Sequence, residues 1–173
     1  VKTFQTDDCP DIPDVAKSML KTLCDQVVAL DDRVTFYDKL IEYHSRIDER
    51  AKRIRTVPGV GPITASAIVA TIGDGKQFKN GREFAAWLGL TPLNRSSGGK
   101  ERLGRISKKG DRYIRRLLVI GMTSQVQRAR GYPERVHPWI MQLLERKPMR
   151  LATIAMANKT ARIILAILTK ETY

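Results

Sequence analysis

The chain has 173 residues, with 31 lysines and arginines against 18 aspartates and glutamates, which gives a formal net charge of +13. This length suits one compact domain with or without a helical appendage, and two cysteines, Cys9 and Cys24, are too few for a disulfide scaffold or a zinc finger. No apolar run of the roughly 18 residues that a membrane helix needs is expected, so we predict a folded cytoplasmic protein without a membrane partner.

The basic charge is confined to one part of the chain. Residues 1–50 carry 7 basic and 11 acidic residues, whereas residues 51–173 carry 24 basic and 7 acidic residues. The densest stretch is 95–116, where nine basic side chains accompany Glu101 and Asp111. Such a stretch predicts a polyanionic partner, and a merely solvated surface is the alternative for an isolated cluster.

The N-terminal part is predicted to contain a linker and one long helix. Residues 1–14 are expected to be a linker remnant, and the first residue, Val1, suggests a piece of a longer protein. Residues 15–54 are predicted to form a single helix with a heptad seam, in which apolar residues recur at spacings of three and four: Leu20, Leu23, Val27, Leu30, Val34, Tyr37 and Ile41. The seam indicates a coiled coil that joins subunits into a homo-oligomer, and a helix packed on its own domain is the open alternative.

Residues 55–173 are expected to form a helical domain that starts with a helix-hairpin-helix motif over 55–72. Gly59 and Gly61 in the Pro-Gly-Val-Gly turn would bring the backbone close to a ligand, and Pro62 suits the first turn of a helix. The unpaired amides of that turn could hold a phosphate, so Gly59 and Gly61 are candidate nucleic-acid-binding residues that contact the backbone rather than the bases. An ordinary helix–helix turn is the alternative.

The rest of the domain is predicted to be helical around one loop. Residues 81–89 are expected to form a short helix whose Phe84, Trp87 and Leu88 face the core. Residues 90–107 combine glycines, a proline, paired serines and basic residues, which predicts a loop or a poorly formed hairpin. Residues 111–170 are predicted to form further helices. No strand-rich run is found, so the predicted fold class is all-α.

Two motifs with fixed spacing lie in and after this loop. One is Gly-Leu-Thr-Pro followed by Ser-Gly over 89–98, and the other is Gly-x-Ile-Ser-Lys-x-Gly-Asp over 104–111. With the Gly-Val-Gly-Pro turn and the heptad helix in the same order, they make the chain resemble the C-terminal part of bacterial transposases of the insertion-sequence 110/1111 family, which are relatives of the Piv DNA invertases. The resemblance covers nearly the whole chain and implies an enzyme that cuts and rejoins DNA strands.

The resemblance implies that Ser97 is the catalytic nucleophile, which attacks a DNA phosphodiester and forms a phosphoserine intermediate. Chemistry alone does not distinguish Ser97 from Ser96. A serine hydroxyl is a weak nucleophile and the phosphoryl oxygens gain charge during attack, so cations are needed nearby. The candidate nucleic-acid-binding residues around Ser97 are therefore glycines that admit the DNA backbone and basic side chains: Arg95, Gly98, Gly99, Lys100, Arg102, Arg105, Lys108, Lys109 and Arg112.

The resemblance also implies partners outside this chain. Family members carry an N-terminal RuvC-like domain whose acidic residues bind a divalent metal, expected to be Mg²⁺, and a structured guide RNA pairs with the DNA. The acidic pattern of that domain is missing here, so no metal ligand or cofactor is predicted in this fragment, which alone is expected to bind nucleic acid without recombining it. The alternative function is a non-catalytic nucleic-acid-binding module that uses the helix-hairpin-helix and the basic loop.

Overall fold

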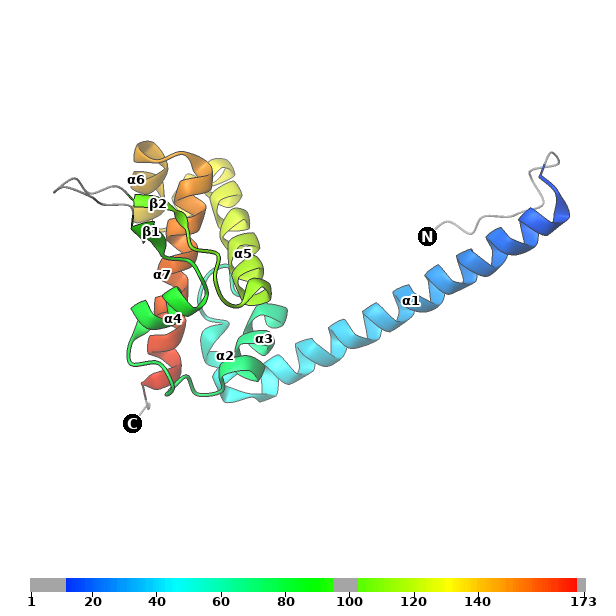
Figure 1. The fold of residues 1–173 in the computed structure, drawn as a ribbon, viewed down its shortest axis with the longest axis horizontal. Helices are drawn as coiled ribbons and strands as arrows, with labels where there is room; N and C mark the ends of the chain where they lie inside the picture. Colours follow the sequence, from blue (N-terminus) through cyan, green and yellow to red (C-terminus); the bar gives the residue numbers. More distant parts are fainter. Residues whose placement is uncertain (1–11, 95–102, 171–173) are drawn as a thin grey trace. The chain divides into compact units, whose positions relative to one another are not determined.

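The computed structural model describes residues 12–94 and 103–170, and the chain divides into two compact units, 1–43 and 44–173. The predicted all-α fold is confirmed, because the regular secondary structure of the described residues is helical apart from one small two-stranded sheet (Figure 1). In chain order the elements are α1 (Asp14–Ile47), α2 (Glu49–Ile54), α3 (Pro62–Ile72), α4 (Gly81–Trp87), β1 (Pro92–Asn94), β2 (Leu103–Ile106), α5 (Arg112–Gly131), the 3-10 helix η2 (Pro133–Arg135), α6 (Pro138–Arg146) and α7 (Met149–Thr169).

The described part of the first unit is most of α1. Asp14 lies in its first turn, where a carboxylate complements the positive end of the helix dipole. The apolar side chains of the predicted heptad seam are exposed in the single chain from Leu20 to Tyr37, with Leu23 and Leu30 each at 57%, whereas Ile41 is half-buried. The first unit therefore presents an apolar surface that its own residues do not cover.

The helix predicted over 15–54 is interrupted at Asp48, which corrects that prediction. Asp48 has an extended backbone (φ −76°, ψ 113°), and its carboxylate accepts hydrogen bonds from the amides of Arg50 at 2.8 Å and Ala51 at 3.3 Å. An aspartate that binds the amides ahead of it ends the helix behind it and becomes the N-cap of the next one. The second compact unit accordingly begins at His44, ahead of the predicted boundary at residue 55.

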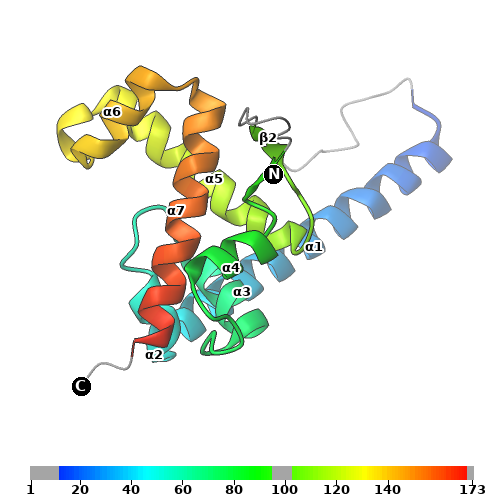
Figure 2. The ribbon, with the colours of Figure 1, turned by 60° about the vertical axis from the view of Figure 1, so that its left-hand side comes forward.

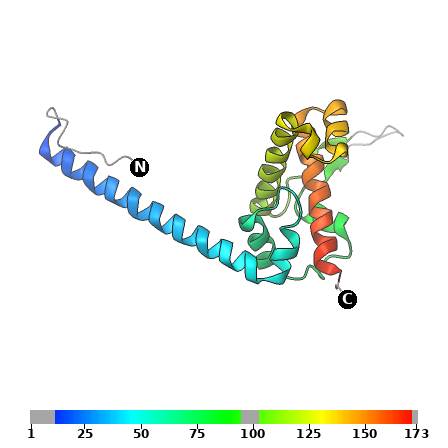
Figure 3. The same ribbon diagram turned by 180° about the vertical axis from the view of Figure 1, so that it is seen from behind.

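α7 is the central helix of the second unit, and α2, α4 and α5 pack against it (Figures 2 and 3). Its small residues Ala152, Ala157 and Ala161 are fully buried, which lets the neighbouring helices approach closely. At the start of α4, a Cβ added to Gly81 would lie 3.0 Å from the Cα of Arg162 on α7. The position of α4 is therefore set by backbone contact with the core helix.

The same helix corrects the expectation that no segment could span a membrane. Residues Met149–Thr169 are long enough and, at a mean hydropathy of 1.5, apolar enough to cross one. Half of that window is buried inside the domain, where α7 meets α4 and α5. Central packing in a helical core accounts for its apolar composition.

Trp87 is not the core residue that the sequence predicted. It is 37% exposed, whereas Phe84 and Leu88 of the same segment are fully buried as predicted. The indole ring stacks on Phe84 with centroids 6.0 Å apart and is tilted against Phe78 at 5.5 Å. Because α4 ends at Trp87, the ring lies at the rim of the core, with one side packed and the other in solvent.

Asp48→Ala is expected to lower the free energy of unfolding by about 1 kcal/mol at pH 7, because α2 loses its N-cap. The hydrogen bond from the Arg50 side chain, followed by those from the amides of Ala51 and Arg50, holds the pKa of Asp48 below 3.8. A pKa lower in the folded than in the unfolded state stabilises the fold above about pH 4, and this contribution is lost as the pH falls through the folded value. Urea unfolding from about pH 7 to pH 2 measures the difference, which should shrink in acid.

Asp48→Asn is the matched control for this measurement. It keeps a capping oxygen but does not titrate, so its stability relative to Asp48→Ala should not depend on the ionisation at residue 48. A wild-type advantage over Asp48→Ala that stays constant across the whole pH range would contradict the prediction.

Candidate nucleic-acid interface

The segment expected to carry the catalytic loop has an ordered stem. β1 and β2 pair antiparallel. The pairing continues towards α4, because the amide of Ser107 donates to the carbonyl of Thr91 at 2.9 Å and the amide of Lys108 donates to that of Gly89 at 3.1 Å. The predicted loop 90–107 is therefore a hairpin at its base, and its two sides leave the domain together between α4 and α5.

Two glycines fix this base by close backbone approach. Gly89 has φ +68°, and a Cβ there would overlap the backbone of Lys109. Gly110 has φ +99°, and a Cβ there would overlap the carbonyl oxygen of Trp87. Only glycine tolerates both a positive φ and such contact, so the chain before the hairpin and the chain after it are held directly against each other. Lys108, at φ 54°, is the one non-glycine residue with a positive φ in the described ranges.

Side-chain donors complete the base of the hairpin. Arg115 of α5 donates from Nη1 to the carbonyl of Leu88 at 2.8 Å, and Asn158 of α7 donates from Nδ2 to the carbonyl of Leu90 at 3.1 Å. These bonds satisfy the carbonyl of Leu88, which is the C-cap of α4, and the carbonyl of Leu90, which follows the helix. Asp111, the N-cap of α5, accepts from the amide of Ile114 at 2.7 Å. The stem is thus connected to α4, α5 and α7.

Sequence reasoning missed the roles of Arg115 and Asn158. Arg115 was grouped with the basic residues that meet a polyanion, but its guanidinium is half-buried and bonds to protein carbonyls. Its partner lies 27 residues away along the chain and that of Asn158 lies 68 residues away. No periodicity or local motif marks such pairs.

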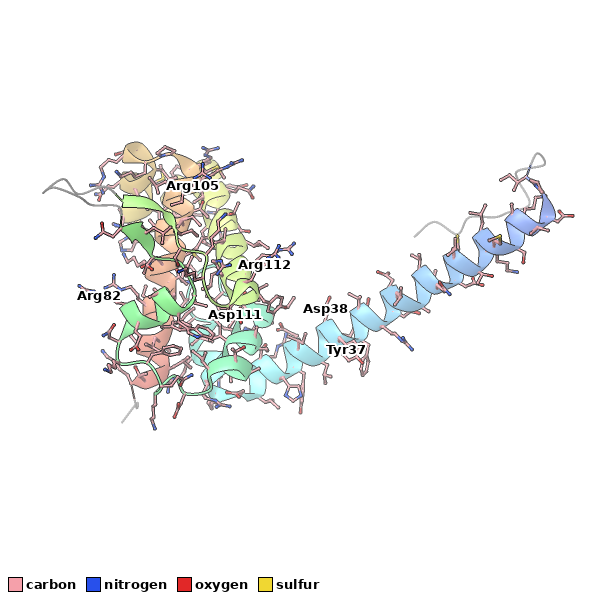
Figure 4. All side chains as sticks on the ribbon, in the orientation of Figure 1. Tyr37, Asp38, Arg82, Arg105, Asp111 and Arg112 are labelled. Atoms are coloured by element: carbon pink, nitrogen blue, oxygen red, sulfur yellow. The ribbon has the colours of Figure 1, made fainter. Side chains whose placement is uncertain are left out.

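Four predicted nucleic-acid-binding side chains lie exposed around the stem. Arg105 is on β2, Lys108 and Lys109 follow the strand, and Arg112 begins α5; Figure 4 labels Arg105, Asp111 and Arg112. Exposed lysines and arginines on a fixed backbone suit contacts with phosphate groups, because their charge stays available to a ligand. The structure therefore brings these four cations to one hairpin base.

The remaining predicted residues of this loop lie outside the described part of the chain. They are the proposed nucleophile with its competitor and the surrounding glycines and cations: Arg95, Ser96, Ser97, Gly98, Gly99, Lys100 and Arg102. Their place in the sequence is between β1 and β2.

Gly59 and Gly61, predicted to hold a phosphate, have different surroundings. Gly59 has φ +85° and packs on α5, where a Cβ added to Gly121 would overlap the Gly59 carbonyl oxygen. Gly61 is exposed, has no heavy atom within 4 Å of a built Cβ, and is the N-cap of α3 without a side-chain capping bond. Gly59 therefore serves packing, and Gly61 leaves the start of α3 accessible.

α5 connects the two predicted contact regions. Its first residue, Arg112, lies at the hairpin base, and Gly121 contacts the Gly59 turn nine residues further along. Nine residues of α-helix span about 14 Å. Both regions are thus fixed to one helix at a separation that a nucleic-acid strand can bridge with a few nucleotides.

The described residues do not supply a metal site. Over 12–94 and 103–170, no group of three or more His, Cys, Asp or Glu side chains is placed to hold a metal ion. The described residues of this chain therefore do not supply the ligands for the divalent metal that the family resemblance places in a RuvC-like domain.

Comparison with known proteins gives a family match over half of the chain. Residues 51–137 match the Transposase IS116/IS110/IS902 family. The chain is 42% identical to a probable family 20 transposase of Pseudomonas aeruginosa over 161 residues, which cover 93% of this chain and 48% of the relative. It is 35% identical to the transposase for insertion sequence element IS1111A of Coxiella burnetii over 158 residues, covering 91% of this chain and 43% of the relative.

Over a shorter stretch, the chain is also similar to a different kind of protein. Over 74 residues the chain is 31% identical to the pilin gene-inverting protein of Moraxella bovis, covering 43% of this chain and 22% of that protein. In all three comparisons this chain spans about half the length of the curated relatives or less.

Gly110→Ala is expected to lower the free energy of unfolding by about 3 kcal/mol, because it combines a left-handed backbone with overlap onto the Trp87 carbonyl. Gly131→Ala, where a Cβ meets nothing within 4 Å, is the matched control and should change stability by less than about 1 kcal/mol. Denaturant unfolding followed by circular dichroism measures both. Equal stability of the two variants would contradict the close approach at Gly110.

Proposed function

The chain belongs to the IS116/IS110/IS902 family of transposases, and we propose that it is the part of a DNA recombinase that contacts DNA and supplies the attacking serine. The proposal is supported by the hairpin base, which backbone contacts and side-chain hydrogen bonds hold against the helices and which has four exposed cations. In the sequence, the hairpin that leaves this base includes Ser97 between its strands. A nucleophile acts best from a rigid support, and such a support is what the base of this hairpin offers.

The proposed contact with DNA is made through its phosphates. Arg105, Lys108, Lys109 and Arg112 are exposed at the hairpin base, and the accessible start of α3 at Gly61 lies on the same domain. Lysine and arginine contacts to phosphate position a protein on a duplex without reading its sequence. We propose that a helix-hairpin-helix formed by α2, the turn and α3 adds backbone contacts through the Gly61 end of α3.

The proposed chemistry is attack of Ser97 on a phosphodiester. The Ser97 Oγ forms a bond to phosphorus, the bond from phosphorus to one bridging deoxyribose oxygen breaks, and the hydroxyl proton passes by way of a base to that leaving oxygen. The product is a phosphoserine and a free DNA hydroxyl, so no oxidant or reductant is needed. Cations near the loop offset the charge that develops on the phosphoryl oxygens, and Arg105 of the described residues is placed on the strand that follows Ser97.

The family resemblance is the basis for proposing two further partners of the enzyme. A RuvC-like domain would hold Mg²⁺ and complete the active site, and a structured guide RNA would select the DNA by base pairing. The exposed cations of this chain suit an RNA phosphate backbone as well as a DNA one, because both present the same charged groups. We propose that the whole transposase uses both partners.

We also propose that α1 joins copies of the chain. Its exposed apolar seam includes Leu23, Leu30 and Val34 at heptad spacing, and burying such a seam against a second helix removes apolar surface from water. The charged residues of α1 lie between the seam positions and remain available to solvent or to a partner helix.

Ser97→Ala should abolish the covalent protein–DNA adduct, whereas Ser96→Ala should leave it, because only the Ser97 hydroxyl is bonded to phosphorus in the proposed intermediate. The test uses a full-length family transposase in which residues 12–170 of this chain replace the matching part, incubated with cognate DNA, guide RNA and Mg²⁺. The adduct is detected by a denaturing gel and mapped by mass spectrometry.

Three other outcomes would change the assignment. An adduct that survives in Ser97→Ala but not in Ser96→Ala would move the nucleophile to Ser96. An adduct that neither substitution removes would exclude both serines. DNA binding without any adduct in the unsubstituted chimaera would favour a non-catalytic binding module.

Leu30→Asp is expected to convert an oligomer into a monomer, because a charge at a seam position cannot be buried without a partner. Lys39→Asp places the same side chain on the opposite face of α1 and is the matched control, which should keep the wild-type mass. Light scattering over a dilution series measures both. A wild-type chain that is monomeric at every concentration would contradict the coiled coil.

A further inference from the structure

An aromatic side chain lies exposed in the first turn of α5, next to the hairpin base. Tyr113 is the second residue of that helix, and its side chain is 57% exposed. Within residues 12–94 and 103–170, the Tyr113 side chain makes no hydrogen bond, ring contact or cation–π contact. Both its hydroxyl and its exposed ring surface are therefore available to a ligand.

The other tyrosine that the structure describes in the second unit has different surroundings. Tyr132, the C-cap of α5, is exposed to nearly the same extent, at 54%, but the guanidinium of Arg135 lies 5.0 Å from the centre of its ring. A cation–π contact of this kind gives an exposed ring a partner within the protein. Tyr113 has no such partner in the described ranges, so Tyr132 is a matched control for it.

Two exposed arginines accompany Tyr113 on the surface of α5. Arg112 precedes it, and Arg116 follows it by three residues (Figure 4 labels Arg112). Residues three and four apart are neighbours on a helix surface, so Arg116 lies beside both Tyr113 and Arg112. Within the part of the chain that the structure describes, neither guanidinium has an ion pair or a hydrogen bond. The start of α5 thus combines one open ring with two unengaged cations.

This combination of side chains lowers the stability of the helix itself. Arg112 lies in the first turn of α5, which contains no acidic residue, so its charge opposes the helix dipole. Arg112 and Arg116 are also like charges at a spacing of four, which destabilises a helix. Local choices that weaken a fold are typical of functional sites, so the three residues are better explained by a ligand than by the stability of α5.

The backbone at Tyr113 is fixed by its neighbours before any ligand binds. Ile114 is fully buried, and its amide donates to the carboxylate of Asp111 at 2.7 Å. Arg115 donates to the carbonyl of Leu88 at 2.8 Å. A ring carried on a fixed backbone loses less entropy when a ligand binds to it.

The chemistry of these side chains indicates the class of the ligand. Proteins that bind single-stranded nucleic acid combine cations that follow the phosphate backbone with aromatic rings on which bases stack. In a duplex each base face is covered by the next base pair, so an external ring reaches it only if the stack opens. A free phosphate ion would engage the arginines but leave the ring without a partner.

We infer that Tyr113 stacks on an unpaired nucleobase while Arg112 and Arg116 contact phosphates of the same strand. This assignment rests on the proposed function, in which the hairpin base contacts nucleic acid, and it names the form of the ligand at the start of α5. Phosphate contacts alone accept a duplex as well as a single strand. The stacking contact is made only by a base that has left its pair, so Tyr113 adds a preference for the unpaired strand.

The test measures the affinity of this chain for a labelled single-stranded DNA and for a duplex of the same sequence over a range of salt concentrations. Tyr113→Ala should weaken single-strand binding about tenfold without changing its salt slope, because a stacking contact is lost but no charge. Its duplex affinity should match that of the wild type. Arg116→Gln should instead lower the single-strand slope by about 0.7, as expected for one phosphate contact. Tyr132→Ala should change neither quantity.

Two further substitutions separate the ring from the rest of the side chain. Tyr113→Phe keeps the ring and should bind the single strand nearly as well as the wild type. Tyr113→Leu keeps an apolar side chain without an aromatic face and should show the same loss as Tyr113→Ala, which provides a second result if the alanine variant fails to fold. Unfolding curves identify any such failure. An RNA strand of the same sequence should show the same loss as the DNA strand, since stacking does not involve the sugar.

Several results would overturn the stacking contact, and one would also remove the proposed function. If Tyr113→Phe bound as weakly as Tyr113→Ala, the contact would be a hydroxyl bond to phosphate. An equal loss on duplex and single strand would exclude the unpaired base, and a loss confined to DNA or to RNA would indicate a sugar contact. Wild-type binding with a steep salt slope, together with Tyr113→Ala that matches Tyr132→Ala, would overturn the stacking alone. Wild-type protein that binds neither strand nor duplex at low salt would overturn both.

Discussion

The contact between the Gly110 backbone and the Trp87 carbonyl determines where the rest of the candidate site lies. It fixes the end of α4 against the start of α5, and the hairpin leaves the domain between them. Arg115 and Asn158 strengthen the same junction by bonding to carbonyls of Leu88 and Leu90. Because these contacts involve backbone and half-buried side chains, the direction of the hairpin depends on the helical core rather than on the composition of the loop.

The basic residues of the domain have two different uses, and net charge alone does not separate them. Arg115 bonds to the end of α4, Arg53 donates to the carbonyl of Ile167 near the end of α7, and Lys159 lies 3.7 Å from the centre of the Trp139 ring. These three cations stabilise the fold through partners within the protein. The cations at the hairpin base instead face solvent, so the electrostatic surface available to a polyanion is smaller and more localised than the composition suggests.

The sequence predicted the helical fold and the exposed basic residues because both depend on local information. Period and composition indicated α3, α4 and the C-terminal helices, and lysines such as Lys108 are exposed because burying their charge would be costly. The break at Asp48 was missed, since the heptad pattern passes over it while a single side chain decides the backbone there. Trp87, Arg115 and Asn158 were missed or misassigned because their surroundings come from residues distant in the sequence.

The paired glycines at Gly59 and Gly121 have a mechanical consequence for the domain. With no side chain between them, the turn before α3 and the middle of α5 are in direct backbone contact, and neither can shift without moving the other. α5 is one continuous helix whose first residue, Arg112, lies beside the hairpin and whose Gly121, nine residues later, contacts the turn. A displacement of the start of α3 is therefore transmitted through the first half of α5 to the base of the hairpin, so these two regions of the domain move together.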